Sequence, residues 1–137
     1  KMKWQYMRKA VFLDRDGVLS KAFIKNVVSH LDPSTPAILS VFAGRIADSG
    51  IDPMSIMKKS VSISKMKPKS EILWASTREI INIFQAEDAG CQIITVPHEL
   101  LNKFSTVGKR LENYSLETVT AFHNDAKAAG YSIKSIK

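Results

Sequence analysis

Residues 71–96, EILWASTREIINIFQAEDAGCQIITV, place a stretch of helical spacing between two short apolar runs. The runs at 71–74 and 92–96 are nearly continuous in apolar character, which is typical of strands buried on both faces of a parallel sheet. The residues between them predict a helix over 77–88, because apolar side chains gather on one side of it: Ile80, Ile81, Ile83 and Phe84. The segment therefore predicts a strand–helix–strand unit, the repeating element of a parallel sheet.

The same alternation runs through the rest of the chain. Apolar, β-branched runs at 10–13 and 37–42 predict two earlier strands. Three helices are predicted with their capping residues: 53–64 (Asp52 as N-cap, Pro53 at the first helical position), 77–88 (Ser76 or Thr77 as N-cap, Gly90 at the end) and 115–129 (starting at Ser115, ended by Gly130). The expected fold class is α/β, with about four parallel strands alternating with helices.

Composition sets limits on the class of protein. The chain of 137 residues is 45% hydrophobic and 24% charged, which is ordinary for one soluble domain. No apolar run approaches the roughly 18 residues of a membrane span. A single cysteine, Cys91, leaves no internal disulfide, so we expect a reduced, cytoplasmic protein.

The net charge of +7 comes mainly from residues 1–26 and 57–70. Basic segments attract anions, but most such runs are solvated helix faces. No aromatic residue lies among the lysines of 57–70, so the stacking partners of single-stranded nucleic acid are missing there. We expect neither a nucleic-acid nor a membrane partner.

From about Val27 onward the sequence resembles the transaldolase and fructose 6-phosphate aldolase family. Four pieces carry the resemblance, in family order: ILSVFAGRIAD (38–48), EILWASTREIINIFQAEDAGCQIITVP (71–97), LLNKF (100–104) and SLETVTAFHNDAKAAGY (115–131). The resemblance implies a (β/α)₈ barrel with its active site at the carboxyl ends of the strands. This chain would supply a partial barrel, with 37–42, 71–75 and 92–96 as the sixth, seventh and eighth strands.

The resemblance also implies a sugar-phosphate site. Arg45, Ser76 and Arg78 match residues that bind the substrate phosphate in the family, and a guanidinium is well suited to hold phosphate oxygens in pairs. Ser76 is expected to open a helix whose free N–H groups favour an anion. The alternative for Arg45 is an ordinary surface ion pair with Asp48.

Further residues match the family's active site or its surroundings. Ser40 matches a serine near the Schiff-base lysine, and Phe42 an aromatic residue that lines the pocket, although core packing explains Phe42 equally well. Cys91 is expected to be a buried, inert thiol. His98 and His123 lack the spacing of metal ligands and are expected at the surface.

The chemistry of transaldolases needs a lysine amine that forms a Schiff base with the ketose carbonyl. No lysine here matches the family's strand-four lysine, and the family's acids for proton transfer have no counterpart either. The resemblance therefore implies binding of a sugar phosphate with little or no catalysis, so whether the chain is an enzyme stays open. No cofactor is implied.

The first residues resemble a different family. KAVFLDRDGVLSKAFIKN (9–26) is similar to the opening of haloacid dehalogenase-like phosphatases. That resemblance implies a nucleophile at Asp14, a general acid/base at Asp16, and Mg²⁺ bound by these carboxylates. The family's later motifs are absent, and Asp-x-Asp-Gly after a strand is also a common turn sequence.

Three functional hypotheses follow. The chain is a transaldolase-like protein that binds sugar phosphates, a phosphatase that uses Asp14 and Asp16, or a non-catalytic module that completes a barrel with a second copy or a partner chain. An open partial barrel leaves an apolar face and strand edges to be covered. We expect a phosphatase-like leader over 1–26 and a transaldolase-like half barrel over 27–137, forming one compact unit.

Overall fold

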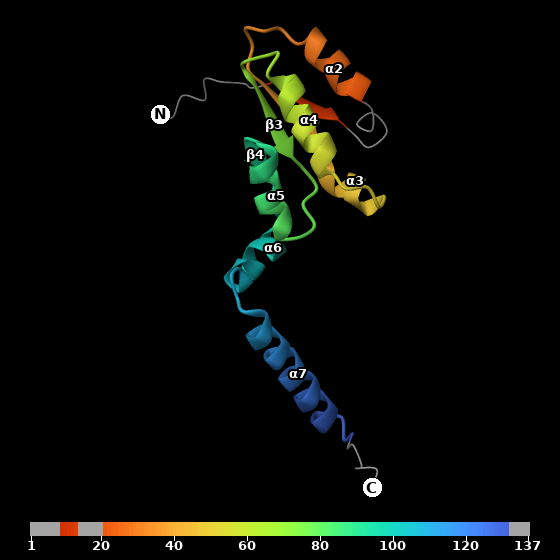
Figure 1. Cartoon of the computed structure of the whole chain (residues 1–137), viewed down its shortest axis with the longest axis vertical. Helices are drawn as coiled ribbons and strands as arrows, with labels where there is room; N and C mark the ends of the chain where they lie inside the picture. The colour runs from red at the N-terminus through yellow and green to blue at the C-terminus, as the bar shows by residue number, and fades with distance from the viewer. Residues whose placement is uncertain (1–8, 14–20, 132–137) are drawn as a thin grey trace, which may run out of the picture. The chain divides into compact units, whose positions relative to one another are not determined.

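The computed structural model describes the backbone of residues 9–13 and 21–131, and the side chains of residues 25–131. Four strands form one parallel sheet in the order β1-β2-β3-β4 (Figure 1). Their bounds are β1 Lys9–Leu13, β2 Ala37–Val41, β3 Ser70–Trp74 and β4 Ile93–Ile94. The predicted α/β fold with about four parallel strands, consistent with a partial barrel, is therefore confirmed.

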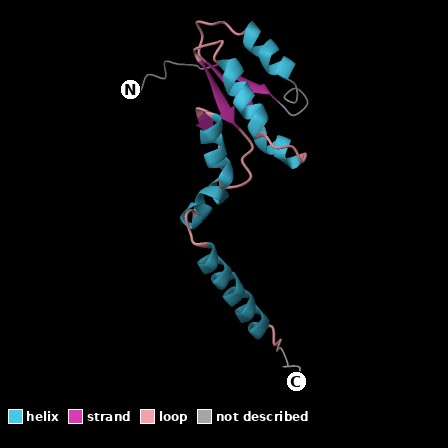
Figure 2. Cartoon of the chain, in the orientation of Figure 1, coloured by secondary structure: helices cyan, strands magenta, loops and turns pink. Residues whose placement is uncertain are grey.

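Helices fill the connections between the strands (Figure 2). Those between strands are α2 Lys21–His30, α3 Ala43–Asp48, α4 Met54–Ser64 and α5 Ile81–Ala89. Helix α6 His98–Asn102, the short 3₁₀ turn η1 Lys103–Thr106 and helix α7 Leu111–Ala128 follow β4. The chain divides into two compact units, residues 1–104 with the sheet and residues 105–137 with α7. Helix α2 crosses the predicted boundary between 1–26 and 27–137, and that division itself stays a prediction.

The core lies on one face of the sheet. Leu39 and Val41 of β2 and Ile72 and Trp74 of β3 alternate along their strands and are fully buried. Their register pairs Leu39 with Ile72 and Val41 with Trp74, so the four side chains share that face. The helices cover it with a matching set of buried side chains: Val28 of α2, Ile46 of α3, Met57 and Val61 of α4, and Ala86 and Ala89 of α5.

Helix α5 uses a different face from the one its larger apolar residues predict. Its buried residues are Ala86 and Ala89, whereas Ile81 and Phe84 are exposed. Small side chains allow a close approach of the helix to its neighbours, which explains why alanines occupy the contact. An ion pair of 2.7 Å between Lys58 and Asp88 also links α4 to α5.

The opposite face of the sheet carries half-buried apolar side chains. Ile38 of β2, Leu73 of β3 and Ile93 of β4 lie there, with Leu73 paired to Ile93 in the register. The prediction that the strands are buried on both faces is therefore met in full only under the helices. On the opposite face Ser40 of β2 is buried, but the apolar side chains are only half-buried. The strand predicted over 92–96 is also shorter than expected, because only Ile93–Ile94 pair with β3.

The ends of the other predicted helices agree in part. Helix α4 begins one residue later than predicted, because Pro53 is its N-cap and Met54 its first helical residue. Asp52 Oδ1 still accepts the N–H of Met54 at 3.0 Å, so the aspartate binds the start of the helix without being its N-cap. Helix α7 begins at Leu111 rather than at the predicted Ser115. None of the helices in the described part of the chain is both long and apolar enough to cross a membrane.

The second unit is held locally at the start of α7. The ammonium group of Lys109 pairs with the carboxylate of Glu117 and lies 5.6 Å from the centre of the Tyr114 ring. Gly130 has φ +78° and follows the helix, as predicted for its end.

Candidate functional site

The candidate site lies at the carboxyl edge of the sheet, where β2 and β3 end side by side. The loop after β2 leads at once into α3, and the loop after β3 runs over residues 75–80. Main-chain hydrogen bonds connect the two: Ala75 N–H donates to Val41 O at 2.8 Å, and Gly44 N–H donates to Ala75 O at 3.3 Å. The structure therefore brings the segment with Arg45 against the segment with Ser76 and Arg78, as the family resemblance implies.

A glycine makes this contact possible. A Cβ atom at Gly44 would lie 1.6 Å from the carbonyl oxygen of Ser76, far inside any allowed separation. Ser76 itself has φ +63°, a left-handed conformation that residues other than glycine rarely adopt. Such a conformation is maintained only where the surroundings enforce it, and here the approach of Gly44 does so.

The left-handed Ser76 also delays the following helix. We predicted that Ser76 or Thr77 caps this helix, and that prediction is wrong, because α5 begins at Ile81. The Thr77 hydroxyl instead donates to Thr95 O at 2.6 Å, and so ties the loop to the chain after β4. Ser76 consequently offers no helix N-terminus to an anion, and its contribution is limited to its hydroxyl and the loop it turns.

The two arginines have different neighbours. The guanidinium of Arg45 lies 4.9 Å from the centre of the Phe42 ring, a cation–π arrangement. Arg78 Nη2 donates to Asp48 Oδ2 at 2.8 Å, so Asp48 pairs with Arg78. The ion pair of Arg45 with Asp48 that we considered is not formed.

A profile of the Transaldolase/Fructose-6-phosphate aldolase family matches residues 17–136 of the sequence. The chain belongs to this family. Three relatives, each described as a probable transaldolase, agree with this. The protein from Caldicellulosiruptor saccharolyticus is 34% identical over 99 residues, which is 64% of this chain and 46% of the relative. Those from a Thermoanaerobacter species and from Nitrosopumilus maritimus are 32% identical over 126 residues (85% of this chain, 56% of the relative) and 36% identical over 67 residues (47% and 30%).

The chain thus spans about half the length of the first two of these transaldolases, 46% and 56%. The Schiff-base chemistry of the family needs no cofactor. The family match starts at residue 17, after Asp14 and Asp16. Both of these aspartates lie outside the described residues, and the phosphatase hypothesis that uses them stays a prediction.

Two further residues of the predicted site lie at the end of β2. Ser40 is 2% exposed and shares a register row with Leu73, so it belongs to the sheet face away from the helices. Phe42 follows the strand and is half-buried beneath the Arg45 guanidinium. Phe42 therefore contacts one of the two proposed phosphate-binding arginines and is not part of the core.

The Cys91 thiol and the possible metal ligands show no reactive arrangement among the described residues. Burial raises the pKa of the Cys91 thiol from 9.0 to about 11, so the reactive thiolate is scarce at neutral pH. Within residues 25–131, no three His, Cys, Asp or Glu side chains gather in a way that would hold a metal ion.

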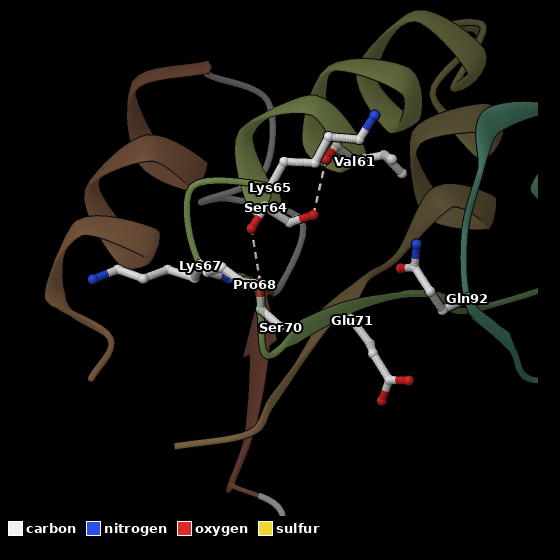
Figure 3. A pocket seen from close by; sticks show the side chains of 8 residues that line it. All are labelled: Val61, Ser64, Lys65, Lys67, Pro68, Ser70, Glu71 and Gln92. Atoms are coloured by element: carbon white, nitrogen blue, oxygen red, sulfur yellow. Dashed lines mark hydrogen bonds between the residues drawn. The ribbon is translucent and has the colours of Figure 1, made fainter. Parts of the chain in front are cut away.

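A pocket of about 410 Å³ lies at the other end of the sheet (Figure 3). It is lined by residues at the end of α4 and at the starts of β3 and β4: Val61, Ser64, Lys65, Lys67, Pro68, Ser70, Glu71 and Gln92. The Ser64 hydroxyl already donates to Val61 O at 2.9 Å, and that of Ser70 to Ser64 O at 3.0 Å. The carboxyl end of a helix and the carboxylate of Glu71 both disfavour an anion. Its serine hydroxyls are already engaged and two nearby features disfavour an anion, so the pocket is a weaker candidate for a phosphate site despite its two lysines.

Neither Gly44 nor Asp48 was among the residues predicted to form the site. For Gly44 a signal existed, because a glycine shortly after a buried strand often marks a close backbone approach. For Asp48 no signal existed, because its partner Arg78 lies on the next loop of the fold.

Proposed function

We propose that this chain binds the phosphate group of a sugar phosphate at the carboxyl edge of its sheet, within the sugar-phosphate chemistry of the transaldolase family. Arg45 and Arg78 would bind the phosphate oxygens, and the Ser76 hydroxyl would donate to one of them. The observation that carries the proposal is the backbone contact of Gly44 with Ser76, which brings the two loops together. Two guanidinium groups, one on α3 and one in the adjacent loop after β3, suit a dianion better than one.

We further propose that the chain alone does not carry out the aldol reaction. The strands β2, β3 and β4 have the sequences AILSV, SEILW and II and contain no lysine. A Schiff base needs a lysine amine beside the bound carbonyl. With fructose 6-phosphate and borohydride, mass spectrometry should therefore detect no covalent adduct. A reduced adduct on any lysine would contradict this part of the proposal.

Isothermal titration calorimetry with fructose 6-phosphate tests the binding. A hydrogen bond to a charged group contributes about 1.5–3 kcal/mol, so Arg45→Ala or Arg78→Ala should weaken binding about 10- to 150-fold. Lys65→Ala is the matched control, because it removes the same charge at the amino edge of the sheet. Inorganic phosphate should compete, and fructose without phosphate should not bind.

The outcomes separate site binding from simple charge attraction. If Lys65→Ala weakens binding as much as the two arginine variants, the attraction comes from the net charge of +7 and the proposed site is wrong. Absence of any binding by the unmodified chain would refute the proposal outright.

The sheet face away from the helices supports one additional role. Ile38, Leu73 and Ile93 are half-buried there, and a partner chain or second copy that covers them would complete the barrel. Sedimentation velocity at micromolar concentration tests this role. A single sharp monomer boundary would contradict it.

A further inference from the structure

The carboxylate of Asp48 forms a hydrogen-bonded ion pair with the guanidinium of Arg78, with 2.8 Å between Oδ2 and Nη2. Asp48 is the last residue of α3, and Arg78 lies in the loop after β3. Each side chain is 52% exposed, and ion pairs with that much exposure contribute little to folding stability. The effect of the pair is therefore to be sought in where it holds the Arg78 side chain.

The main chain of Arg78 is fixed separately. Asn82 Oδ1 accepts the N–H of Arg78 at 2.9 Å and the N–H of Glu79 at 3.0 Å. Asn82 belongs to the first turn of α5, so it anchors the loop to that helix. Arg78 is consequently held at its backbone by α5 and at its guanidinium by α3.

We propose that Asp48 is a positioning residue, which holds the guanidinium of Arg78 in the orientation that binds a phosphate. This inference rests on the function proposed above. A guanidinium has five N–H groups, so the bond to Asp48 leaves donors for two phosphate oxygens. A long side chain that is already ordered spares the ligand an ordering cost of about two- to tenfold in affinity.

The charge of Asp48 acts in the opposite direction. A carboxylate beside the site repels the phosphate dianion, although water and salt screen this repulsion at an exposed position. The two effects are separable by substitution. Asp48→Asn keeps an oxygen that accepts from Arg78 and removes the charge, whereas Asp48→Ala removes both.

Calorimetry with fructose 6-phosphate then distinguishes positioning from repulsion. We expect Asp48→Ala to weaken binding about three- to tenfold, and Asp48→Asn to bind as tightly as the unmodified chain or more tightly. Asp88→Ala is the matched control, because Asp88 of α5 also pairs with a basic residue, Lys58 of α4, away from the proposed site. This substitution should leave the affinity for fructose 6-phosphate within about twofold of that of the unmodified chain. In an Arg78→Ala background, Asp48→Ala should cause no further weakening.

A measurement without ligand provides a second readout. In a ¹⁵N spectrum at low temperature, the Nη2–H signals of Arg78, which donate to Asp48, should show faster solvent exchange in Asp48→Ala than in the unmodified chain, while circular dichroism confirms that both are folded. An unchanged Arg78 signal would overturn the positioning role.

The outcomes keep the two proposals apart. If Arg78→Ala weakens binding but Asp48→Ala does not, or tightens it, Asp48 has no positioning role and the phosphate site stands. If the unmodified chain does not bind, or if neither arginine variant changes the affinity, the phosphate site and the role of Asp48 are both wrong.

Discussion

Replacement of Gly44 by alanine tests the contact that joins the two loops of the site. In most helices a glycine-to-alanine change stabilises by about 0.5–1 kcal/mol. Here the new Cβ would lie 1.6 Å from Ser76 O, whereas such contacts essentially never fall under 3.0 Å. The segments that hold Gly44 and Ser76 must therefore move apart by about 1.4 Å or more. The separation breaks the hydrogen bond from Gly44 N–H to Ala75 O.

The steric clash and the broken hydrogen bond together set the expected loss of unfolding free energy. Overpacking costs about 1–3 kcal/mol, and a lost hydrogen bond adds about 1 kcal/mol, so Gly44→Ala should lower the free energy of unfolding by about 2–4 kcal/mol. For a domain of ordinary stability this is a large fraction of the total. A loss of 3 kcal/mol moves the urea midpoint down by about 1–3 M, at an m-value of about 1–3 kcal/mol per M.

Urea unfolding followed by circular dichroism provides the measurement, with Gly50→Ala as the control. Gly50 has φ +80° and no atom within 4 Å of its added Cβ, so only backbone strain of about 1–2 kcal/mol is expected. Gly44→Ala should also weaken binding of fructose 6-phosphate, and Gly50→Ala should not. If Gly44→Ala has the same urea midpoint as the unmodified chain, or lowers the free energy of unfolding by less than Gly50→Ala does, the segments of Gly44 and Ser76 are not in backbone contact.

Three further changes test the core, the thiol and the sheet edge. Trp74 is fully buried and its indole N–H has no acceptor among the described residues, so Trp74→Phe should change the free energy of unfolding by less than about 1.5 kcal/mol, against about 3–5 kcal/mol for Trp74→Ala in the same urea titration. The pKa of Cys91 is raised to about 11, so the rate of its alkylation by iodoacetamide should increase about tenfold per pH unit between pH 8 and 10. In the urea-unfolded chain the alkylation rate should instead reach its plateau above pH 9.0, the ordinary pKa of the thiol. Because this pKa is higher in the folded state, the thiol's contribution to stability is complete below about pH 9 and is lost as the pH rises toward 11, and a melting temperature that rises over this range would contradict the assignment. Gln92 Oε1 accepts the N–H of the buried Ile72 at 2.8 Å, so Gln92→Ala should cost about 1–3 kcal/mol in thermal or urea unfolding, whereas Gln85→Ala on α5 should cost less than about 0.5 kcal/mol.

The strands were predictable because burial leaves a direct trace in the sequence. The runs at 37–42 and 71–74 match β2 and β3 within one residue at each end. Gly90 is also left-handed, with φ +81°, at the end of α5, as its place after a helical pattern predicts. These features depend on residues close together in the chain, where periodicity and capping preferences act.

The details of the site depend on contacts between distant segments, and local patterns do not reveal them. From its local sequence Ser76 is predicted to be a helix cap, whereas in the fold it is left-handed and its carbonyl packs closely against Gly44 of α3. Asp48 lies three residues after Arg45 in the sequence, which suggests a local pair, yet the fold places Arg78 within hydrogen-bond distance instead. The resemblance to the family named two segments that the structure brings into contact, and their packing decides how the side chains in them are held.

The order of the strands in the sheet has a consequence for how the chain forms its structure. Each strand pairs with the one that precedes it in the sequence, from β1 through β4. During synthesis, a strand that leaves the ribosome therefore finds its neighbour already made, and no strand must wait for a later one to be inserted between two others. Assembly can advance in one direction along the chain, with β4 and the loop contacts of Thr77 and Gln92 closing last. Ribosome-bound chains from whose exit tunnel residue 74 has emerged should already protect the amides of β2 and β3 from exchange.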